Sequence, residues 1–275
     1  MSDKYSATWV SHSSVGDFLK CARAYYLHNV YKDPKTGRKI NVINPPLALG
    51  QAVHEVLEGL VEYKAEERMK EPLALRLEKN WKKYAGKKGG FKSLDEEVAT
   101  KERALGMLAR VEANPGPLIN KTVRIPGDLP HYYLSAAENI ILCGKVDWLE
   151  YMPEDDSVHI IDFKTGKNEE NADSLQLPMY HLLVRNSQKR AISKASYWYL
   201  DRDDGLIEKE LPSLVDAEKR VLDAARRVKA ARETKSFDCP RGAERCFACR
   251  PFEAILSGEA EFVGVGEYNQ DMYVL

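Results

Sequence analysis

Three residues in the middle of the chain, Asp147, Asp162 and Lys164, have the types and the spacing to hold a divalent cation. The segments 140–151 and 158–164 are rich in β-branched and other apolar residues, so both are predicted to be strands of one hairpin. A turn centred between Glu154 and Asp155 places Asp147 directly opposite Asp162, with their Cβ atoms roughly 4.5–5.5 Å apart. Two carboxylates at this distance repel each other unless a cation lies between them. Oxygen ligands of this kind suit Mg²⁺ or Mn²⁺.

Lys164 lies two residues beyond Asp162, so strand alternation puts both side chains on one face. There its ammonium group could orient a water or stabilise charge that develops on a phosphate. The side chain of Phe163 points the other way, into the core, although its backbone carbonyl could reach the ion. The simpler alternative is a solvated Asp147 and a surface Asp162–Lys164 ion pair. We favour the metal site because charges in strongly apolar strands are costly unless they are paired or bind metal.

The surrounding pattern predicts the helices that would position this hairpin. Ser11 or Ser13 can cap a first helix, and Pro45 and Pro46 lead into a second helix after a loop over 33–45. Further segments with clear periodicity are helices at about 64–115, 174–185 and 214–235, and a second hairpin over 195–211. The sequence therefore predicts one α/β domain over residues 1–275, with a small mixed central sheet flanked by helices and a helical insertion at about 64–115.

Four motifs occur in an order that is typical of one family. The segments 144–147 (GKVD) and 161–166 (IDFKTG) resemble motifs II and III of RecB-like PD-(D/E)XK nucleases. His54 in 50–58 (GQAVHEVLE) matches the family's early histidine, and Gln176 and Tyr180 match its Gln-x-x-x-Tyr motif.

The resemblance implies a restriction-endonuclease-like core and metal-dependent hydrolysis of DNA. It makes His54, Asp147, Asp162 and the Phe163 carbonyl the metal ligands, and Lys164 the residue that assists the attacking water. Gln176 and Tyr180 would position the substrate strand. Glu58 shares a helical face with His54, and we interpret it as a solvated acid rather than a partner of the site.

Four of the five cysteines could form a second metal site, because Cys246 and Cys249 form a CxxC that Cys21 and Cys239 could complete. Four thiolates can bind Zn²⁺ or a [4Fe–4S] cluster, and the ligand count does not separate them. The arrangement is similar to the iron–sulfur branch of the family, which includes the AddB nuclease domain, exonuclease V and CRISPR-associated RecB-like nucleases. That similarity implies a [4Fe–4S] cluster whose cysteine ligands join a carboxy-terminal region (239–249) to the first helix. Ile255 stands where the family has its last cysteine, so Cys239 would supply the fourth thiolate. We interpret Cys143 as a core residue.

The formal net charge of −1 means that nucleic acid would have to bind to local basic patches. One patch lies on the last long helix and beyond it, and we favour it over a second patch between Lys82 and Lys92. The first patch comprises Lys219, Arg220, Arg226, Arg227, Lys229, Arg232, Lys235, Arg241, Arg245 and Arg250. No apolar run reaches the roughly 18 residues of a membrane span, and the first residues do not resemble a signal peptide, so we expect a cytoplasmic protein without a membrane partner.

The function that these patterns favour is a DNA exonuclease that prefers single-stranded DNA or single-stranded ends. The resemblance places it in DNA repair, recombination, mobile-element or CRISPR-related processing, with a helicase or integrase as a possible protein partner. One alternative is a catalytically silent DNA-binding or assembly module with a structural Fe–S or zinc site. Another is a zinc hydrolase, which the absence of an HExxH or similar spacing disfavours.

Overall fold

A four-stranded mixed sheet in the order β5-β6-β7-β8 forms the centre of the computed structural model, which describes residues 3–275. Its strands are β5 (Trp148–Met152), β6 (Ser157–Lys164), β7 (Ala191–Tyr199) and β8 (Ile207–Lys209). The β5–β6 hairpin has the predicted register, since Trp148 pairs with Ile161 and Met152 pairs with Ser157. Strand β7 runs parallel to β6, and α6 (Gln176–Ser187) connects the two.

Helices cover both faces of this sheet. Alternate strand residues such as Trp148, Phe163 and Trp198 pack in one apolar cluster with α3 (Pro45–Glu58), α4 (Leu73–Trp81) and α5 (Leu94–Ala113). Residues of the opposite parity, such as Ile160 and Tyr197, pack against α6. The alternation that places apolar residues on both faces thus produces a three-layer core. The predicted mixed α/β fold with flanking helices and a helical insertion is confirmed.

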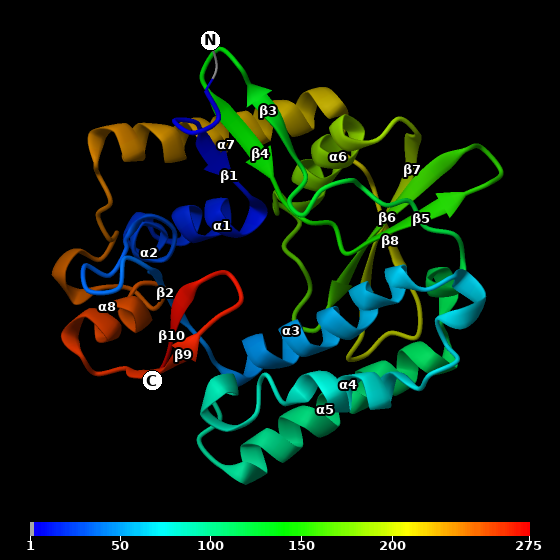
Figure 1. The fold of residues 1–275 in the computed structure, drawn as a ribbon. Helices are drawn as coiled ribbons and strands as arrows, with labels where there is room; N and C mark the ends of the chain where they lie inside the picture. Colours follow the sequence, from blue (N-terminus) through cyan, green and yellow to red (C-terminus); the bar gives the residue numbers. More distant parts are fainter. Residues whose placement is uncertain (1–2) are drawn as a thin grey trace.

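Two smaller sheets extend the molecule on the side of the first helices (Figure 1). Strands β1 (Thr8–Val10), β4 (Ile140–Cys143) and β3 (His131–Ser135) form one sheet, in the order β1-β4-β3. Strands β2 (Lys39–Val42), β10 (Gln270–Val274) and β9 (Glu261–Val265) form the other, in the order β2-β10-β9. In the sequence, β1 and β2 are separated by α1 (His12–Lys20), α2 (Ala22–Tyr25) and one turn of π-helix, η1 (Tyr26–Val30).

The prediction of one strand over 140–151 was wrong. The segment 144–147 leaves the sheet of β4 and enters the sheet of β5, because β4 pairs with β1 and β3 while β5 pairs with β6. Each half is apolar enough to be a strand, so the sequence pattern does not reveal the change of sheet. The predicted loop over 33–45 was also wrong in part, since Lys39–Val42 forms β2 by pairing with the distant β10.

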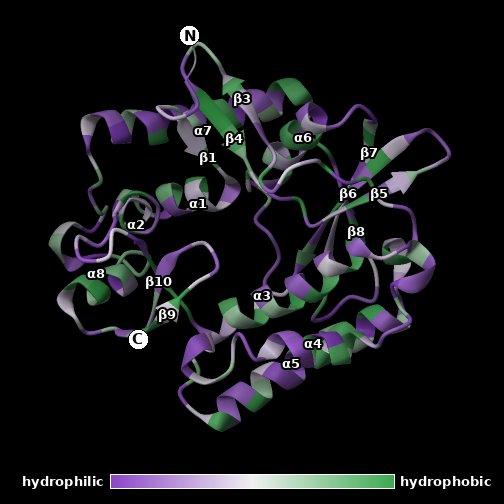
Figure 2. Cartoon of the chain, viewed as in Figure 1, coloured by the Kyte–Doolittle hydropathy of each residue, from purple (hydrophilic) through white to green (hydrophobic). Residues whose placement is uncertain are grey.

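The remaining long helix, α7 (Leu214–Thr234), packs against α6 and the β1-β4-β3 sheet. Along α3, α5 and α7, apolar and hydrophilic residues alternate as expected for helices with one buried face (Figure 2). Ser11 caps α1, as predicted, by accepting a hydrogen bond from the backbone N–H of Ser14. A short helix, α8 (Arg250–Ser257), leads into the β9–β10 hairpin. Among residues 3–275, no helix combines the length and the apolar character that a membrane span requires.

Candidate metal-dependent active site

His54, Glu58 and Asp147 bring one ligand atom each into a group in which all distances are within 4.8 Å. His54 and Glu58 lie one turn apart on α3, and His54 Nδ1 is 3.2 Å from Glu58 Oε1. Asp147 lies just before β5, with its Oδ2 atom 3.5 Å from His54 Nδ1. The backbone N–H of Phe163 donates to the same oxygen at 2.8 Å, which fixes the carboxylate against β6. The interpretation of Glu58 as a solvated acid apart from the site was therefore wrong in part, since Glu58 contacts His54 while about a third of its side chain stays exposed.

Asp162 and Lys164 form a second group, on the face of β6 that α6 covers. Lys164 Nζ lies 2.9 Å from Asp162 Oδ2 and 3.1 Å from an oxygen of Glu170, and it also donates to the side-chain oxygen of Gln176. Gln176 Nε2 donates in turn to Asp162 Oδ1 at 2.8 Å and to the hydroxyl of Tyr180 at 3.3 Å. These contacts fix the amide orientation of Gln176 between the acid and the amine.

The two groups adjoin each other, but Asp162 is not within the tight cluster formed by His54, Glu58 and Asp147. The predicted residues thus come together as two contacting sets, linked through Phe163. The side chain of Phe163 packs in the core as expected, and His54 lies edge-on to its ring at 6.0 Å. Gln176 and Tyr180, expected to touch the substrate, are both buried, with 6% and 8% exposure.

The electrostatics of the site favour a bound cation. Burial, and then the nearby Asp162 carboxylate, raise the pKa of Asp147 well above its usual range. Burial alone would lower the pKa of His54, but the carboxylates of Asp147 and Glu58 outweigh it and raise that pKa to about 9. Among the described residues, none donates to Asp162 Oδ2 with hydrogen-bonding geometry, although the ammonium of Lys164 is near. The site thus holds buried carboxylate groups, and one of their oxygens, Asp162 Oδ2, lacks a full hydrogen-bond partner within residues 3–275. This arrangement fits a hard divalent ion, which binds carboxylate oxygens.

Two residues that the sequence did not single out also lie at the site. Glu170 follows β6, and its backbone N–H donates to the Tyr199 hydroxyl at 3.1 Å while its carboxylate faces Lys164. His12 begins α1, and the charges of Glu170, Lys164 and Asp162 act on its imidazole, whose pKa is lowered mainly by burial. Neither residue belongs to a spacing pattern with the hairpin, so only the folded chain brings them together.

Two cavities open beside this site and share Lys145. The larger, of 620 Å³, is lined by His54 and Glu58 and by the β9–β10 hairpin. The smaller, of 150 Å³, lies between the start of α1 and Tyr180. The basic residues on the larger cavity are Lys83, Lys88 and Lys145. Two residues of the Lys82–Lys92 patch, Lys83 and Lys88, therefore line this cavity. In the favoured patch, Arg226 pairs with Glu138 and Lys229 pairs with Glu233.

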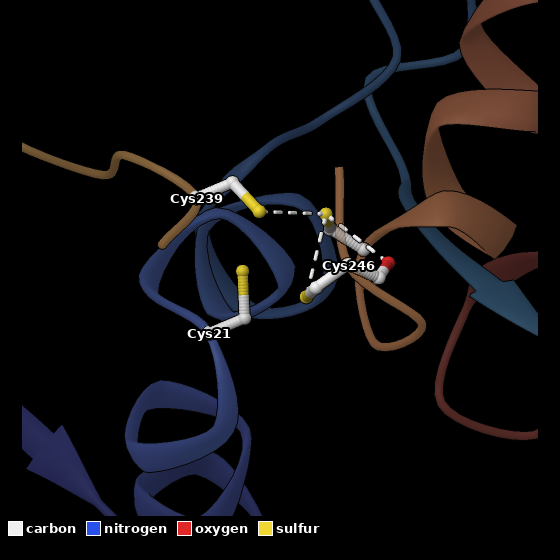
Figure 3. A group of neighbouring side chains, drawn as sticks. Cys21, Cys239 and Cys246 are labelled. Carbon is white, nitrogen blue, oxygen red and sulfur yellow. Dashed lines mark hydrogen bonds between the residues drawn. The ribbon is translucent and has the colours of Figure 1, made fainter. Parts of the chain in front are cut away.

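The four predicted cysteine ligands do come together (Figure 3). Cys21, Cys239, Cys246 and Cys249 are all buried, and their sulfur atoms lie within 4.8 Å of one another. Cys249 Sγ is 3.6 Å from Cys239 Sγ and 3.8 Å from Cys246 Sγ. The backbone N–H groups around the CxxC turn lower the pKa of the Cys246 thiol to about 7 despite the opposing effect of burial. Cys143 is only half-buried rather than a core residue, and Ile255 is buried on α8.

Comparisons with known proteins agree with this geometry. The sequence model of the PD-(D/E)XK nuclease superfamily matches residues 9–252. Among solved structures, a "Putative exonuclease" from Eubacterium rectale superposes with a TM-score of 0.53 at 15% identity, covering 89% of this chain and 88% of that chain. At this identity the likeness concerns the fold. No curated protein matches the sequence.

Proposed function

The chain belongs to the PD-(D/E)XK nuclease superfamily, and on that premise we propose that it is a metal-dependent nuclease that hydrolyses phosphodiester bonds of DNA. The observation that carries the proposal is the convergence of His54, Glu58 and Asp147 beside the Asp162–Lys164 pair. A site without catalytic use would not be expected to hold two carboxylates within 4.8 Å of one histidine and a third, Asp162, beside them, because the mutual repulsion of the carboxylates costs stability.

In this proposal, His54, Asp147, Asp162 and the Phe163 carbonyl hold Mg²⁺ or Mn²⁺, with Glu58 beside them. When bound, the ion would supply positive charge where negative charge develops on the phosphate. Burial lowers the pKa of Lys164, but Asp162 and Glu170 outweigh burial and raise it, so the side chain is an ammonium group. It therefore orients the attacking water and stabilises the phosphate oxygens as a hydrogen-bond donor, and it does not act as a base.

Gln176 and Tyr180 take a different role from the expected contact with the substrate. Because both are buried and hydrogen-bonded within the site, we propose that they position Asp162 and Lys164. Such supporting contacts hold reacting groups in the productive geometry before the substrate arrives.

The direct test measures cleavage of end-labelled single- and double-stranded DNA in Mg²⁺ and in Mn²⁺. The parent should cleave, and Lys164→Ala and Asp162→Ala should each lose about 10²-fold or more of the rate, the usual cost of removing a group that stabilises transition-state charge. Lys167→Ala, a change to a neighbouring lysine outside the ion-pair network, is the matched control. Undiminished cleavage by Lys164→Ala would refute the assignment. DNA binding without turnover by the parent would instead indicate a catalytically silent module.

We further propose exonuclease action on single-stranded DNA or single-stranded ends, in the cytoplasm and in DNA repair, recombination or mobile-element processing. The structural neighbour described as an exonuclease supports the exonuclease part. End-labelled substrates test it directly, because an exonuclease releases labelled mononucleotides or short products from one end, whereas an endonuclease first yields internal fragments. A helicase or integrase partner stays a prediction from the resemblance.

For the cysteines we propose a metal–thiolate centre formed by Cys21, Cys239, Cys246 and Cys249. The resemblance favours a [4Fe–4S] cluster. The sulfur spacing favours a single Zn²⁺, because four ligands at the usual Zn–S distance of about 2.3 Å in a tetrahedron lie about 3.8 Å apart. Anaerobic purification followed by iron, sulfide and zinc analysis and an absorption spectrum decides between them. Four iron and four sulfide per chain would establish the cluster, and one zinc per chain would establish the ion.

A further inference from the structure

The β9–β10 hairpin forms one wall of the 620 Å³ cavity beside the proposed metal site. Residues 263–268 of the hairpin line one side of this cavity, and His54 and Glu58 of α3 line the other. We infer that the cavity is a groove for single-stranded DNA next to the scissile bond, and that Tyr268 stacks on a base of that strand. The inference rests on the proposed function and adds to it the element that recognises the substrate. The volume is within the roughly 300–1,000 Å³ of small-ligand pockets, which suits a short segment of one strand.

The hairpin is held firmly against the rest of the molecule. Strand β10 pairs with β2 in parallel, and the fully buried Asp271 accepts hydrogen bonds from Arg38 Nε at 2.6 Å and from the Thr36 hydroxyl at 2.5 Å. On the other strand, Lys87 pairs with Glu261 at 2.7 Å. A buried carboxylate with these partners fixes the register of β10, so the wall keeps its place relative to α3.

Tyr268 lies in the tight turn at the tip of this hairpin. The turn is closed by hydrogen bonds from the N–H of Gly266 to Gln270 O at 2.9 Å and from the N–H of Asn269 to Gly266 O at 3.0 Å. Asn269 adopts the left-handed conformation with a φ of 56°, and the Tyr268 side chain is 81% exposed. A large exposed aromatic ring on a fixed turn is a suitable platform for a base. Bases of a duplex are stacked and paired inside it, so this ring would select an unpaired strand.

The charges of the groove indicate that stacking contributes much of the binding. Lys83 is neutralised, because it pairs with Glu55 and lies 3.5 Å from Glu267. Within residues 3–275, neither Lys88 nor Lys145 has a carboxylate within ion-pair distance, so these two remain available for phosphates. The cavity lining also carries three acidic side chains, Glu55, Glu58 and Glu267. Their negative charge offsets the positive charge of the two lysines, so the groove as a whole attracts a polyanion only weakly. Recognition of a base face therefore has to add to a few phosphate contacts.

The test measures binding separately from cleavage. A Lys164→Ala chain in Mg²⁺ is titrated with a fluorescein-labelled oligothymidine that carries one terminal 2-aminopurine, and with a blunt duplex of the same length. Tyr268→Ala in this background should weaken single-strand binding about tenfold, as loss of one base–aromatic stack does, and should reduce the quenching of 2-aminopurine. Tyr268→Phe should retain both, and duplex binding should change little.

Tyr5→Ala is the matched control, since Tyr5 is 88% exposed but lies near the amino terminus, away from the groove. Equal single-strand affinity and equal quenching for Tyr268→Ala and its Lys164→Ala parent would overturn the inference, as would absence of single-strand binding by that parent. If the wild-type chain cleaves DNA while Tyr268 has no effect, only this inference fails. If Tyr268 affects binding while the wild-type chain cleaves nothing, the groove stands and the proposed catalysis fails.

Discussion

Gln176 contacts both members of the Asp162–Lys164 pair, so a substitution of Gln176 tests whether catalysis requires this pair to be held in place. We expect Gln176→Ala to lower kcat by about 10- to 100-fold, the usual cost of removing a partner that orients active-site ligands. KM should stay nearly constant, because the buried amide does not face the substrate. Steady-state cleavage of a labelled oligonucleotide gives both constants.

Tyr180→Phe is the matched control, since it removes only the hydroxyl that lies 3.3 Å from Gln176 Nε2 and keeps the ring in the core. It should cost much less than Gln176→Ala. A raised KM with unchanged kcat for Gln176→Ala would contradict the positioning role. That result would instead restore the substrate contact that the sequence led us to expect.

The residues that could be predicted from sequence are those with a local pattern. The register of the β5–β6 hairpin was predicted, since a turn of known position fixes which residues oppose each other, and this register is what singles out Asp147, Asp162 and Lys164 as candidates. The proximity of Glu58 to Asp147 could not be predicted, because it depends on how α3 packs on the sheet. Glu170 and His12 lie in different segments and approach Lys164 only in the folded chain.

A buried hydrogen-bond network within the central sheet shows that catalytic geometry alone does not make an active site. Glu150 Oε2 is 2.9 Å from His159 Nδ1, and His159 Nε2 is 2.8 Å from Ser196 Oγ. The connectivity is that of an acid–His–Ser triad, but Ser196 is 1% exposed, so no substrate reaches its hydroxyl. We therefore interpret the Glu150–His159–Ser196 hydrogen-bond network as one that stabilises the fold.

This assignment predicts a pH-dependent contribution to folding. Burial alone raises the pKa of Glu150, but hydrogen bonds from His159 and Asn120 outweigh burial and lower the net value. Because the folded pKa is below the unfolded one, the carboxylate stabilises the fold above about pH 4.3, and this stabilisation is lost as the pH falls through the lower folded value. Glu150→Gln should reduce the free energy of unfolding by about 2 kcal/mol at pH 7.

Urea unfolding of the parent and of Glu150→Gln across pH 3 to 7 tests this sign. The difference in free energy of unfolding should narrow as the pH falls from about 4.3 through the lower folded pKa of Glu150, because the carboxylate of the parent becomes protonated over this range. A difference that grows toward low pH would show that the carboxylate is not the stabilised form.

At the scale of the elements, those formed by local contacts were predicted from the sequence, and those formed by pairing between distant segments were not. The long helices α3, α6 and α7 have periodic patterns and the β5–β6 hairpin has a defined turn, so their positions were predicted, whereas the short helix α8 was not. The short strands β1, β2 and β10 form parallel pairs with partners far along the chain. Three to five residues carry too little periodicity to predict such a pairing.

Arg68 connects the helical insertion to the strand that follows Asp147. Its buried guanidinium group donates to the carbonyls of Leu60, Leu118 and Asn120 and lies 4.9 Å from the ring of Trp148. We expect Arg68→Met to lower the free energy of unfolding by about 3 kcal/mol, because several buried carbonyls lose their donor. Arg68→Lys should recover little of it, since an ammonium group cannot span these acceptors.

Urea unfolding measures this effect, and Arg124→Met is the control, because Arg124 lies on the surface with over half its side chain exposed. Equal midpoints for Arg68→Met and Arg124→Met would mean that the guanidinium contacts do not hold the insertion to the sheet.

At the scale of the whole molecule, the cysteine site joins the two ends of the chain. Cys21 follows α1, and Cys239, Cys246 and Cys249 precede α8, which leads into β9. Arg23 and Arg245 both pair with Glu253 of α8, at 2.8 and 3.0 Å. A bound metal would therefore close a long loop and hold the segment that carries the hairpin beside the active site. Closing long loops removes the most entropy from the unfolded chain.

Loss of this closure should affect stability and DNA binding together. We expect Cys21→Ser to lower the metal content, to reduce Tm by several degrees and to weaken single-strand binding, because the β9–β10 wall of the groove then loses one of its anchors and keeps only the β2 pairing and the Asp271 contacts. Cys143→Ser changes a half-buried thiol outside the cluster and should retain the metal and the binding. Metal analysis, thermal unfolding and fluorescence anisotropy on both variants check the three expectations. If Cys21→Ser lost its metal and yet bound single strands like the parent, the cysteine site would stabilise the fold without supporting the groove.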